Sequence, residues 1–196
     1  MTLSKALMPS QSLPSRLFMV LGGSLFISIA AQISVPMLPV PMTLQTLAIL
    51  LVGFTFGARM GVATLLAYLA EGAAGLPVFA NFHNGLAFFG PTAGFLIGFV
   101  LMAWIAGYAA DRGIKGFVGT AAVALLASAA IYVPGVVWAM SLAERAGLDT
   151  AQWGADNVSM IWQYYMAPFL IGDAVKAVIA ALIVAGGWAA IKGRKA

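Results

Sequence analysis

The 196-residue chain contains no cysteine and a single histidine, His83. Disulfide bonds and thiolate metal sites are therefore excluded, and one histidine cannot form a histidine metal cluster by itself. The sequence also lacks a GxxxxGK[ST] phosphate loop, an HExxH zinc motif and a recognisable serine, histidine and aspartate arrangement. We expect neither a catalytic centre nor a cofactor.

Charge is scarce as well. Only 8% of the residues are charged and 62% are hydrophobic, with a mean hydropathy of +0.99, whereas soluble domains carry roughly 25% charged residues. This composition predicts an integral membrane protein. The net charge of +4 comes from basic residues scattered singly, which membrane topology explains better than a nucleic-acid partner.

The order of apolar segments predicts an all-α protein with six transmembrane helices. Residues 1–15 are expected to form a flexible cytoplasmic leader, and residues 16–196 a single membrane domain. The runs 44–56 and 61–76 are two tilted spans or one re-entrant hairpin, and we favour two spans. The six expected spans are 17–34, 44–56, 61–76, 92–110, 117–140 and 164–191.

Three segments between these spans have a composition of their own. Three prolines within residues 36–41 exclude a helix there, because each removes an amide donor and restricts its neighbour. Residues 76–92 mix Pro, Gly, Asn and aromatics, which favours a structured loop that serves as a membrane interface or a ligand lid. Residues 141–163 form an extended polar loop, and Pro134 is expected to kink the span before it.

The basic residues predict the orientation. With six spans, eight of the ten Lys and Arg fall on one side, which the positive-inside rule makes cytoplasmic together with both termini. Of the other two, Arg145 lies in the outer polar loop, and only Lys176 lies inside a span. The eight are Lys5, Arg16, Arg59, Arg112, Lys115, Lys192, Arg194 and Lys195.

The last span carries a carboxylate and an ammonium, Asp173 and Lys176. A charge at the bilayer centre costs about 2.5 to 3.5 kcal/mol on insertion scales, so neither side chain can face lipid. At positions i and i+3 they share one helix face and are close enough to pair. They form either a structural ion pair or part of an outward-facing polar cavity, and we favour the cavity.

Four motifs carry a resemblance that extends from about residue 20 to 190. They are "VPMTLQTL" at 41–48, "GLPVFA" at 75–80, "GPTAGFLIGF" at 90–99 and "GDAVK" at 172–176. In this order and spacing they resemble the BioY family, the biotin-specific substrate-binding components of energy-coupling-factor transporters. The resemblance implies a six-helix protein of the bacterial inner membrane that captures biotin from outside. It also implies three partners, namely a transmembrane coupling subunit and two cytoplasmic ATPases.

The resemblance implies ligand contacts for several residues. Asp173 would accept hydrogen bonds from the ureido N–H groups of biotin and Lys176 would meet the valeryl carboxylate, although the opposite division is possible. Asn84 is the candidate for a further ureido contact, with Asn81 and His83 as alternatives. The remaining candidates for the pocket are Thr43, Gln45, Tyr68, Glu71, Phe79 and Tyr164, with Glu71 also able to pair with Lys176.

The face that docks the coupling subunit is expected on the first span, where small residues would let a partner helix approach closely. The best matches are Ser24, Ser28 and Ala30, with ordinary packing inside this chain as the alternative. Gly90, Gly94 and Gly98 recur every four residues and are expected to allow close helix packing within the chain.

Two other functions stay open at the level of sequence. One is an intramembrane enzyme that uses Asp173 or Glu71 as an acid or base. The other is a binding component for a different vitamin, such as riboflavin or thiamin. A channel is disfavoured, because the polar residues gather toward the outer side instead of lining a path through several helices.

Overall fold

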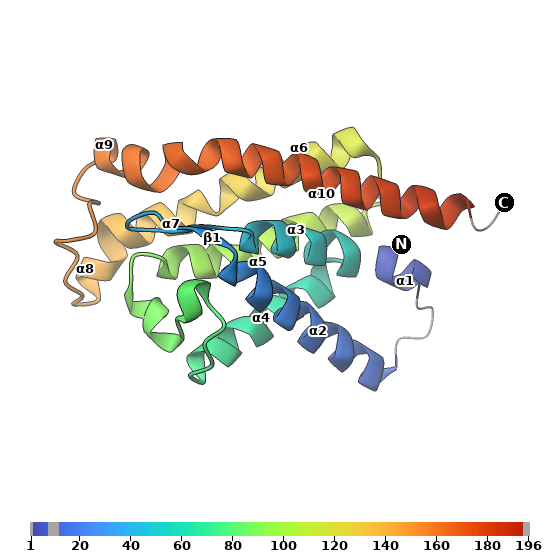
Figure 1. The fold of residues 1–196 in the computed structure, drawn as a ribbon, viewed down its shortest axis with the longest axis horizontal. Coiled ribbons are helices and arrows are strands. Elements are labelled where there is room, and N and C mark those ends of the chain that lie inside the picture. Colours follow the sequence, from blue (N-terminus) through green and yellow to red (C-terminus); the bar gives the residue numbers. More distant parts are fainter. Residues whose placement is uncertain (1, 8–11, 194–196) are drawn as a thin grey trace.

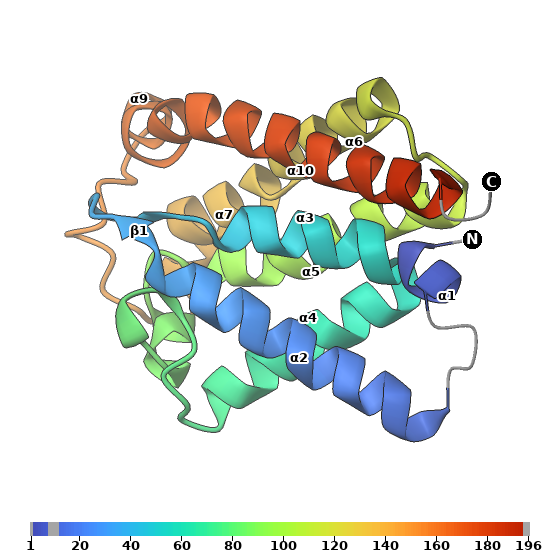
Figure 2. The same ribbon diagram turned by 45° about the vertical axis from the view of Figure 1, so that its right-hand side comes forward.

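The structure, a computed structural model, describes residues 2–7 and 12–193. It consists mainly of helices lying side by side, with α1 and the end of α10 at one end of the molecule and the strand β1 toward the other (Figures 1 and 2). The long helices are α2 (Leu13–Gln32), α3 (Gln45–Phe56), α4 (Ala58–Ala73), α5 (Ala93–Asp111), α6 (Phe117–Ala130) and α10 (Ala167–Gly193). Shorter pieces are α1 (Leu3–Leu7), α7 (Tyr132–Val137), α8 (Ala143–Arg145) and α9 (Val158–Ile161).

The expected helical membrane protein is confirmed at the level of its long apolar helices. Within residues 2–7 and 12–193, four helices are long and apolar enough to cross a membrane: 13–32, 93–111, 117–145 and 158–191. The α3 helix is apolar but has only 12 residues, and α4 has 16. At 1.5 Å per residue these two helices are roughly 18 and 24 Å long, less than the roughly 30 Å hydrocarbon core of a bilayer.

The proline-rich segment before α3 forms a β-hairpin instead of further helical turns. Ser34–Val35 (β1) and Met42–Thr43 (β2) pair antiparallel, with Ser34 opposite Thr43, and the three prolines lie in and beside the turn between them. The chain is therefore extended where a longer helix would otherwise fill space, as the prolines predict. This hairpin leaves room for a cavity above the first turn of α3.

The α5 helix lies at the centre of the bundle, in contact with α3, α4, α6 and α7 (Figure 2). Its glycines allow this close packing. A Cβ on Gly94 would lie 2.3 Å from the carbonyl oxygen of Pro134, and one on Gly98 would lie 3.2 Å from Cα of Ile131. The predicted packing role is confirmed for these two glycines. Gly90 instead lies in the loop before α5, where a Cβ would contact only the carbonyl oxygen of Ala87, at 3.7 Å.

Prolines also shape the last two long helices. The helix that begins at Phe117 is interrupted at Ile131, three residues before Pro134, as expected for a residue without an N–H group. It continues through the π-helical turn η3 (Trp138–Leu142) to Arg145. A second π-helical turn, η4 (Trp162–Met166), precedes Pro168 at the start of α10.

Several predicted boundaries shift. The polar loop is confined to residues 146–157, shorter than the predicted 141–163, because the helices on both sides continue past their apolar stretches. Residues 3–7 of the expected leader form α1, which packs against α3 and α10. Of the basic residues used for orientation, Arg194 and Lys195 lie outside the described residues, as do the side chains of Lys5 and Lys192.

Candidate functional site

A cavity of about 380 Å³ lies beneath the β1–β2 hairpin. Its walls come from six places in the chain: the hairpin, the first turn of α3, the loop 79–92, the start of α5, the start of α7, and α10. The loop 79–92 contains two 3-10 turns, η1 (Ala80–Phe82) and η2 (Gly85–Phe89), which confirms the structured loop expected there.

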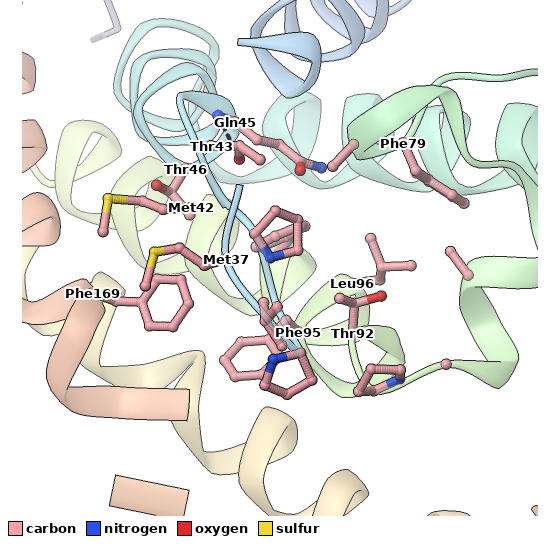
Figure 3. Close-up of a pocket in the computed structure, with 18 of the residues that line it drawn as sticks. Met37, Met42, Thr43, Gln45, Thr46, Phe79, Thr92, Phe95, Leu96 and Phe169 are labelled. Atoms are coloured by element: carbon pink, nitrogen blue, oxygen red, sulfur yellow. Dashed lines mark hydrogen bonds between the residues drawn. The ribbon is translucent and has the colours of Figure 1, made fainter. Parts of the chain in front are cut away.

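Most of the cavity wall is apolar. Phe95 and Phe169 lie on the side of α5 and α10, Phe79 lies on the opposite side, and Met37 and Met42 project from the hairpin toward Phe169 (Figure 3). Phe79 is held in place by edge-to-face contacts with Tyr68 and Phe88, at centroid distances of 5.2 and 5.4 Å. Such walls suit the apolar body of a small ligand.

Four polar groups converge on one part of this wall. Lys176 and Asp173 are each 6% exposed, and their charged atoms lie 3.7 Å apart. The Lys176 ammonium donates to Thr46 Oγ1 at 3.0 Å, and the Tyr132 hydroxyl donates to Asp173 Oδ2 at 2.5 Å. The buried pair therefore has two further partners, which a buried ion pair requires to offset its desolvation.

This polar cluster lies deep in the cavity. The α10 helix runs from the hairpin end of the molecule toward the opposite end, and Lys176 is seven residues beyond Phe169. At 1.5 Å per residue, Lys176 lies about 10 Å further along the axis than Phe169. A ligand that contacts both Phe169 and Lys176 therefore extends along α10 by about this distance.

The cavity gathers only part of the predicted set. Thr43, Gln45, Phe79, Asp173 and Lys176 line it, and so do Asn81 and His83, the alternatives to Asn84. The Thr43 hydroxyl also accepts from the amide of Gln45 at 3.1 Å, so it stabilises the start of α3 as well (Figure 3).

Four predicted pocket residues, all in the described part of the chain, lie outside the cavity wall: Tyr68, Glu71, Asn84 and Tyr164. The Asn84 side chain caps η2 by accepting from the amide of Leu86. Tyr68 lies behind the wall, where it accepts from Gln45 Nε2 at 2.8 Å and donates to the carbonyl of Val78 at 3.0 Å. Tyr164 belongs to η4 and is 39% exposed, while its neighbour Tyr165 is buried.

The pairing considered for Glu71 with Lys176 does not form in the structure. Glu71 accepts a hydrogen bond from Ser24 on α2. Lys176 instead forms an ion pair with Asp173 and donates a hydrogen bond to Thr46. The reason is the placement of the helices, since α4 and α10 lie on opposite sides of the central α5 in both views (Figures 1 and 2).

The residues considered for partner docking face inward in this chain. Ser24 is fully buried and bonds Glu71, and Ala30 is 7% exposed. Ser28 donates to the carbonyl of Ser24 one turn earlier on α2. These side chains make packing contacts within the chain, as in the alternative interpretation of the sequence.

Sequence reasoning missed Thr46 and Tyr132. Thr46 is in the motif "VPMTLQTL", next to the selected Gln45, but a threonine in a helix gives no signal of its own. Tyr132 lies two residues before Pro134 in an apolar run, where a tyrosine that needs a hydrogen-bond partner is the only indication of a buried polar group.

Comparison with known proteins decides the family. The model of the BioY family matches residues 5–193. The chain belongs to the BioY family. Among its relatives, a probable biotin transporter BioY of Pyrococcus horikoshii is 36% identical over 157 residues, which cover 80% of this chain and 85% of the relative. The biotin transporter BioY of Rhizobium etli is 36% identical, covering 77% and 79% of the two chains. That of Thermotoga maritima is 32% identical, covering 80% and 86%.

A solved structure supports the fold assignment of this BioY chain. The S-component for biotin from an ECF-type ABC transporter superposes with a TM-score of 0.68 at 23% sequence identity. The match covers 95% of this chain and 96% of that protein. The fold of this chain is therefore similar to that of this S-component over nearly its whole length.

Proposed function

We propose that this chain is the biotin-binding subunit of an energy-coupling-factor uptake transporter, and not an enzyme. The observation that carries the proposal is the buried Asp173–Lys176 cluster at the deep end of an apolar cavity, in a chain of a family whose named members are biotin transporters. Biotin combines an apolar bicycle and aliphatic chain with a ureido group at one end and a carboxylate at the other. The cavity offers matching surfaces for the apolar part.

The geometry favours the ureido end for both members of the pair. Asp173 and Lys176 lie 3.7 Å apart, so one end of a ligand meets them together, whereas the two polar ends of biotin are separated by the ring and the aliphatic chain. A ureido group has an acceptor oxygen beside two N–H donors. Lys176 would donate to that oxygen and Asp173 would accept from an N–H, which replaces the division expected from the sequence.

The carboxylate would then lie toward the cavity mouth. The polar side chains there come from the hairpin and the loop 79–92, and include Thr43, Asn81 and His83. Of these, Asn81 and His83 are exposed, so a carboxylate among them keeps part of its hydration. This avoids the cost of burying a second charge in an apolar wall.

We also propose that the chain has six spans, with the cavity facing outward and both termini in the cytoplasm. The four long helices supply four spans, and α3 with its hairpin and α4 with its loop supply the others. Arg59, Arg112 and Lys115 lie at helix ends or turns remote in sequence from the cavity segments, as the positive-inside rule requires of a cytoplasmic face.

Import through this subunit needs energy from other chains. The sequence has no phosphate-binding loop for ATP, so we propose a transmembrane coupling subunit and two cytoplasmic ATPase subunits as partners. In this scheme the chain captures biotin at the outer face of the plasma membrane and the partners drive its release inside.

Equilibrium binding of labelled biotin to the detergent-purified chain tests the proposal. We expect one site per chain, with the label displaced by unlabelled biotin and not by riboflavin or thiamin. The absence of saturable binding in a sample with a cooperative thermal transition would refute biotin as the ligand. Displacement by another vitamin at equal concentration would instead assign the cavity to that vitamin.

A further inference from the structure

The cavity wall contains a short turn, residues 79–83, that is held by hydrogen bonds from a residue outside the wall. Phe79, Ala80, Asn81 and His83 line the cavity, and the amide of Phe79 bonds the carbonyl of His83 at 2.9 Å to close the turn. The side chain that fastens this turn to the bundle is Gln32, at the end of α2. Gln32 is partly buried and is not part of the cavity wall.

The Gln32 amide bonds the turn at two points. Its Nε2 donates to the carbonyl of Phe79 at 3.0 Å, and its Oε1 accepts from the amide of Phe82 at 3.0 Å. The same Nε2 also donates to the carbonyl of Ser28 at 3.2 Å, which fixes the side chain against its own helix. A side-chain amide supplies both the donor and the acceptor that this arrangement uses.

The backbone held by these bonds is strained. Asn81 and Phe82 have φ angles of 56° and 59°, in the left-handed region that residues other than glycine rarely adopt. For the bulky Phe82 this conformation is a clear outlier. Such conformations persist only where surrounding contacts enforce them. Here the Phe82 amide donates a hydrogen bond to Gln32 Oε1.

Other contacts would hold one end of the turn if Gln32 were lost. Phe79 is 2% exposed and packs against Tyr68 and Phe88, so it stays anchored to the bundle. Asn81 and Phe82 are exposed. The side chain of Asn81 also accepts a hydrogen bond at its Oδ1 from the Ser34 hydroxyl on the hairpin, at 3.3 Å. Loss of Gln32 would thus free residues 80–83 while the aromatic wall behind them remains.

We infer that Gln32 is a positioning residue that keeps the 80–83 turn closed over the cavity and so sets how long biotin stays bound. The inference rests on the proposed binding of biotin to this cavity. It assigns to α2 an effect on the ligand that is transmitted through the turn, since α2 contributes no residue to the cavity wall within the described chain. Opening of the 80–83 turn requires the two hydrogen bonds from Gln32 to the turn to break.

The test compares Gln32→Leu with Gln163→Leu, which makes the same chemical change at an exposed position in η4. We expect Gln32→Leu to raise the dissociation rate of biotin about tenfold, the factor that corresponds to about 1.4 kcal/mol. The association rate should change much less, and Gln163→Leu should match wild type. Gln32→Glu keeps the acceptor for the Phe82 amide but places a carboxylate oxygen against the carbonyls of Phe79 and Ser28, so it should also raise the dissociation rate.

Hydrogen exchange in the ligand-free protein gives a second readout. We expect amides 80–83 to exchange faster in Gln32→Leu while those of α4 and α5 are unchanged, a pattern that general loss of stability would not produce. An unchanged dissociation rate, or exchange increased equally throughout the chain, would overturn the inference and leave the proposed function standing. Failure of the wild-type chain to bind biotin would overturn both.

Discussion

Replacing Lys176 by methionine tests which end of biotin lies deep in the cavity. In the wild-type chain the Lys176 ammonium is 6% exposed and lies 3.0 Å from Thr46 Oγ1 and 3.7 Å from Asp173 Oδ1. A hydrogen bond from this ammonium to the ureido oxygen is worth about 1.5 to 3 kcal/mol. Its loss should weaken biotin binding roughly 10- to 150-fold.

The decisive comparison uses biotin and its neutral amide, in which the carboxylate is replaced. If Lys176 binds the ureido end, Lys176→Met weakens both ligands by the same factor, because the substituted end lies elsewhere. Isothermal titration or competition with labelled biotin measures the two factors. Lys115→Met is the matched control, since the Lys115 ammonium lies over the Trp188 ring at 4.0 Å, outside the cavity wall.

One result would refute this reasoning. If wild type prefers biotin to the amide by tenfold or more, and Lys176→Met abolishes that preference, the ammonium binds the carboxylate. Methionine at position 176 also leaves Asp173 without its cation, and breaking a buried pair in this way can cost about 3 to 5 kcal/mol of stability. The double variant Lys176→Met with Asp173→Asn removes that charge. Recovery of its thermal midpoint would show that the unpaired carboxylate causes the loss of stability in the single variant.

Two other substitutions probe the walls of the cavity. We expect Tyr132→Phe to weaken biotin binding about tenfold, because Asp173 loses a 2.5 Å charge-assisted hydrogen bond worth about 1.5 to 3 kcal/mol. Unchanged affinity in a titration would show that Asp173 does not need the Tyr132 hydroxyl to bind the ligand. We expect Gly72→Ala to lower both thermal stability and biotin affinity, because its Cβ would lie 2.1 Å from the Phe79 ring and displace it into the cavity. The cost of such overpacking is about 1 to 3 kcal/mol. Gly186→Ala is the control, since nothing lies within 4 Å of its Cβ, and its thermal midpoint should equal or exceed that of wild type.

Features that depend on neighbours along the chain were predictable. The apolar runs predicted where the long helices lie, and the prolines at 36–41 excluded a helix where the hairpin forms. The spacing of Asp173 and Lys176 predicted their ion pair, because residues three apart on a helix share a face. The ordered motifs predicted the BioY family, which the family comparison confirms.

Features that depend on which helix faces meet were not predictable. In a soluble helix the polar side reveals which face is buried, but these helices are apolar all round, toward lipid as well as toward the bundle. Hydropathy therefore could not show that Glu71 meets Ser24, or that Asn81 and His83 reach the cavity while Asn84 caps a turn.

The sequence alone determined that this is a helical membrane protein of the BioY family with one charged pair in its last long helix. Only the tertiary structure decided which side chains contact that pair, by bringing Thr46 to Lys176 across 130 positions and Tyr132 to Asp173 across 41. The physical reason is that spacing within one helix follows from its 3.6-residue period. Contacts between apolar helices depend instead on close packing at small residues and on hydrogen bonds between buried polar groups, which form only once the bundle has assembled.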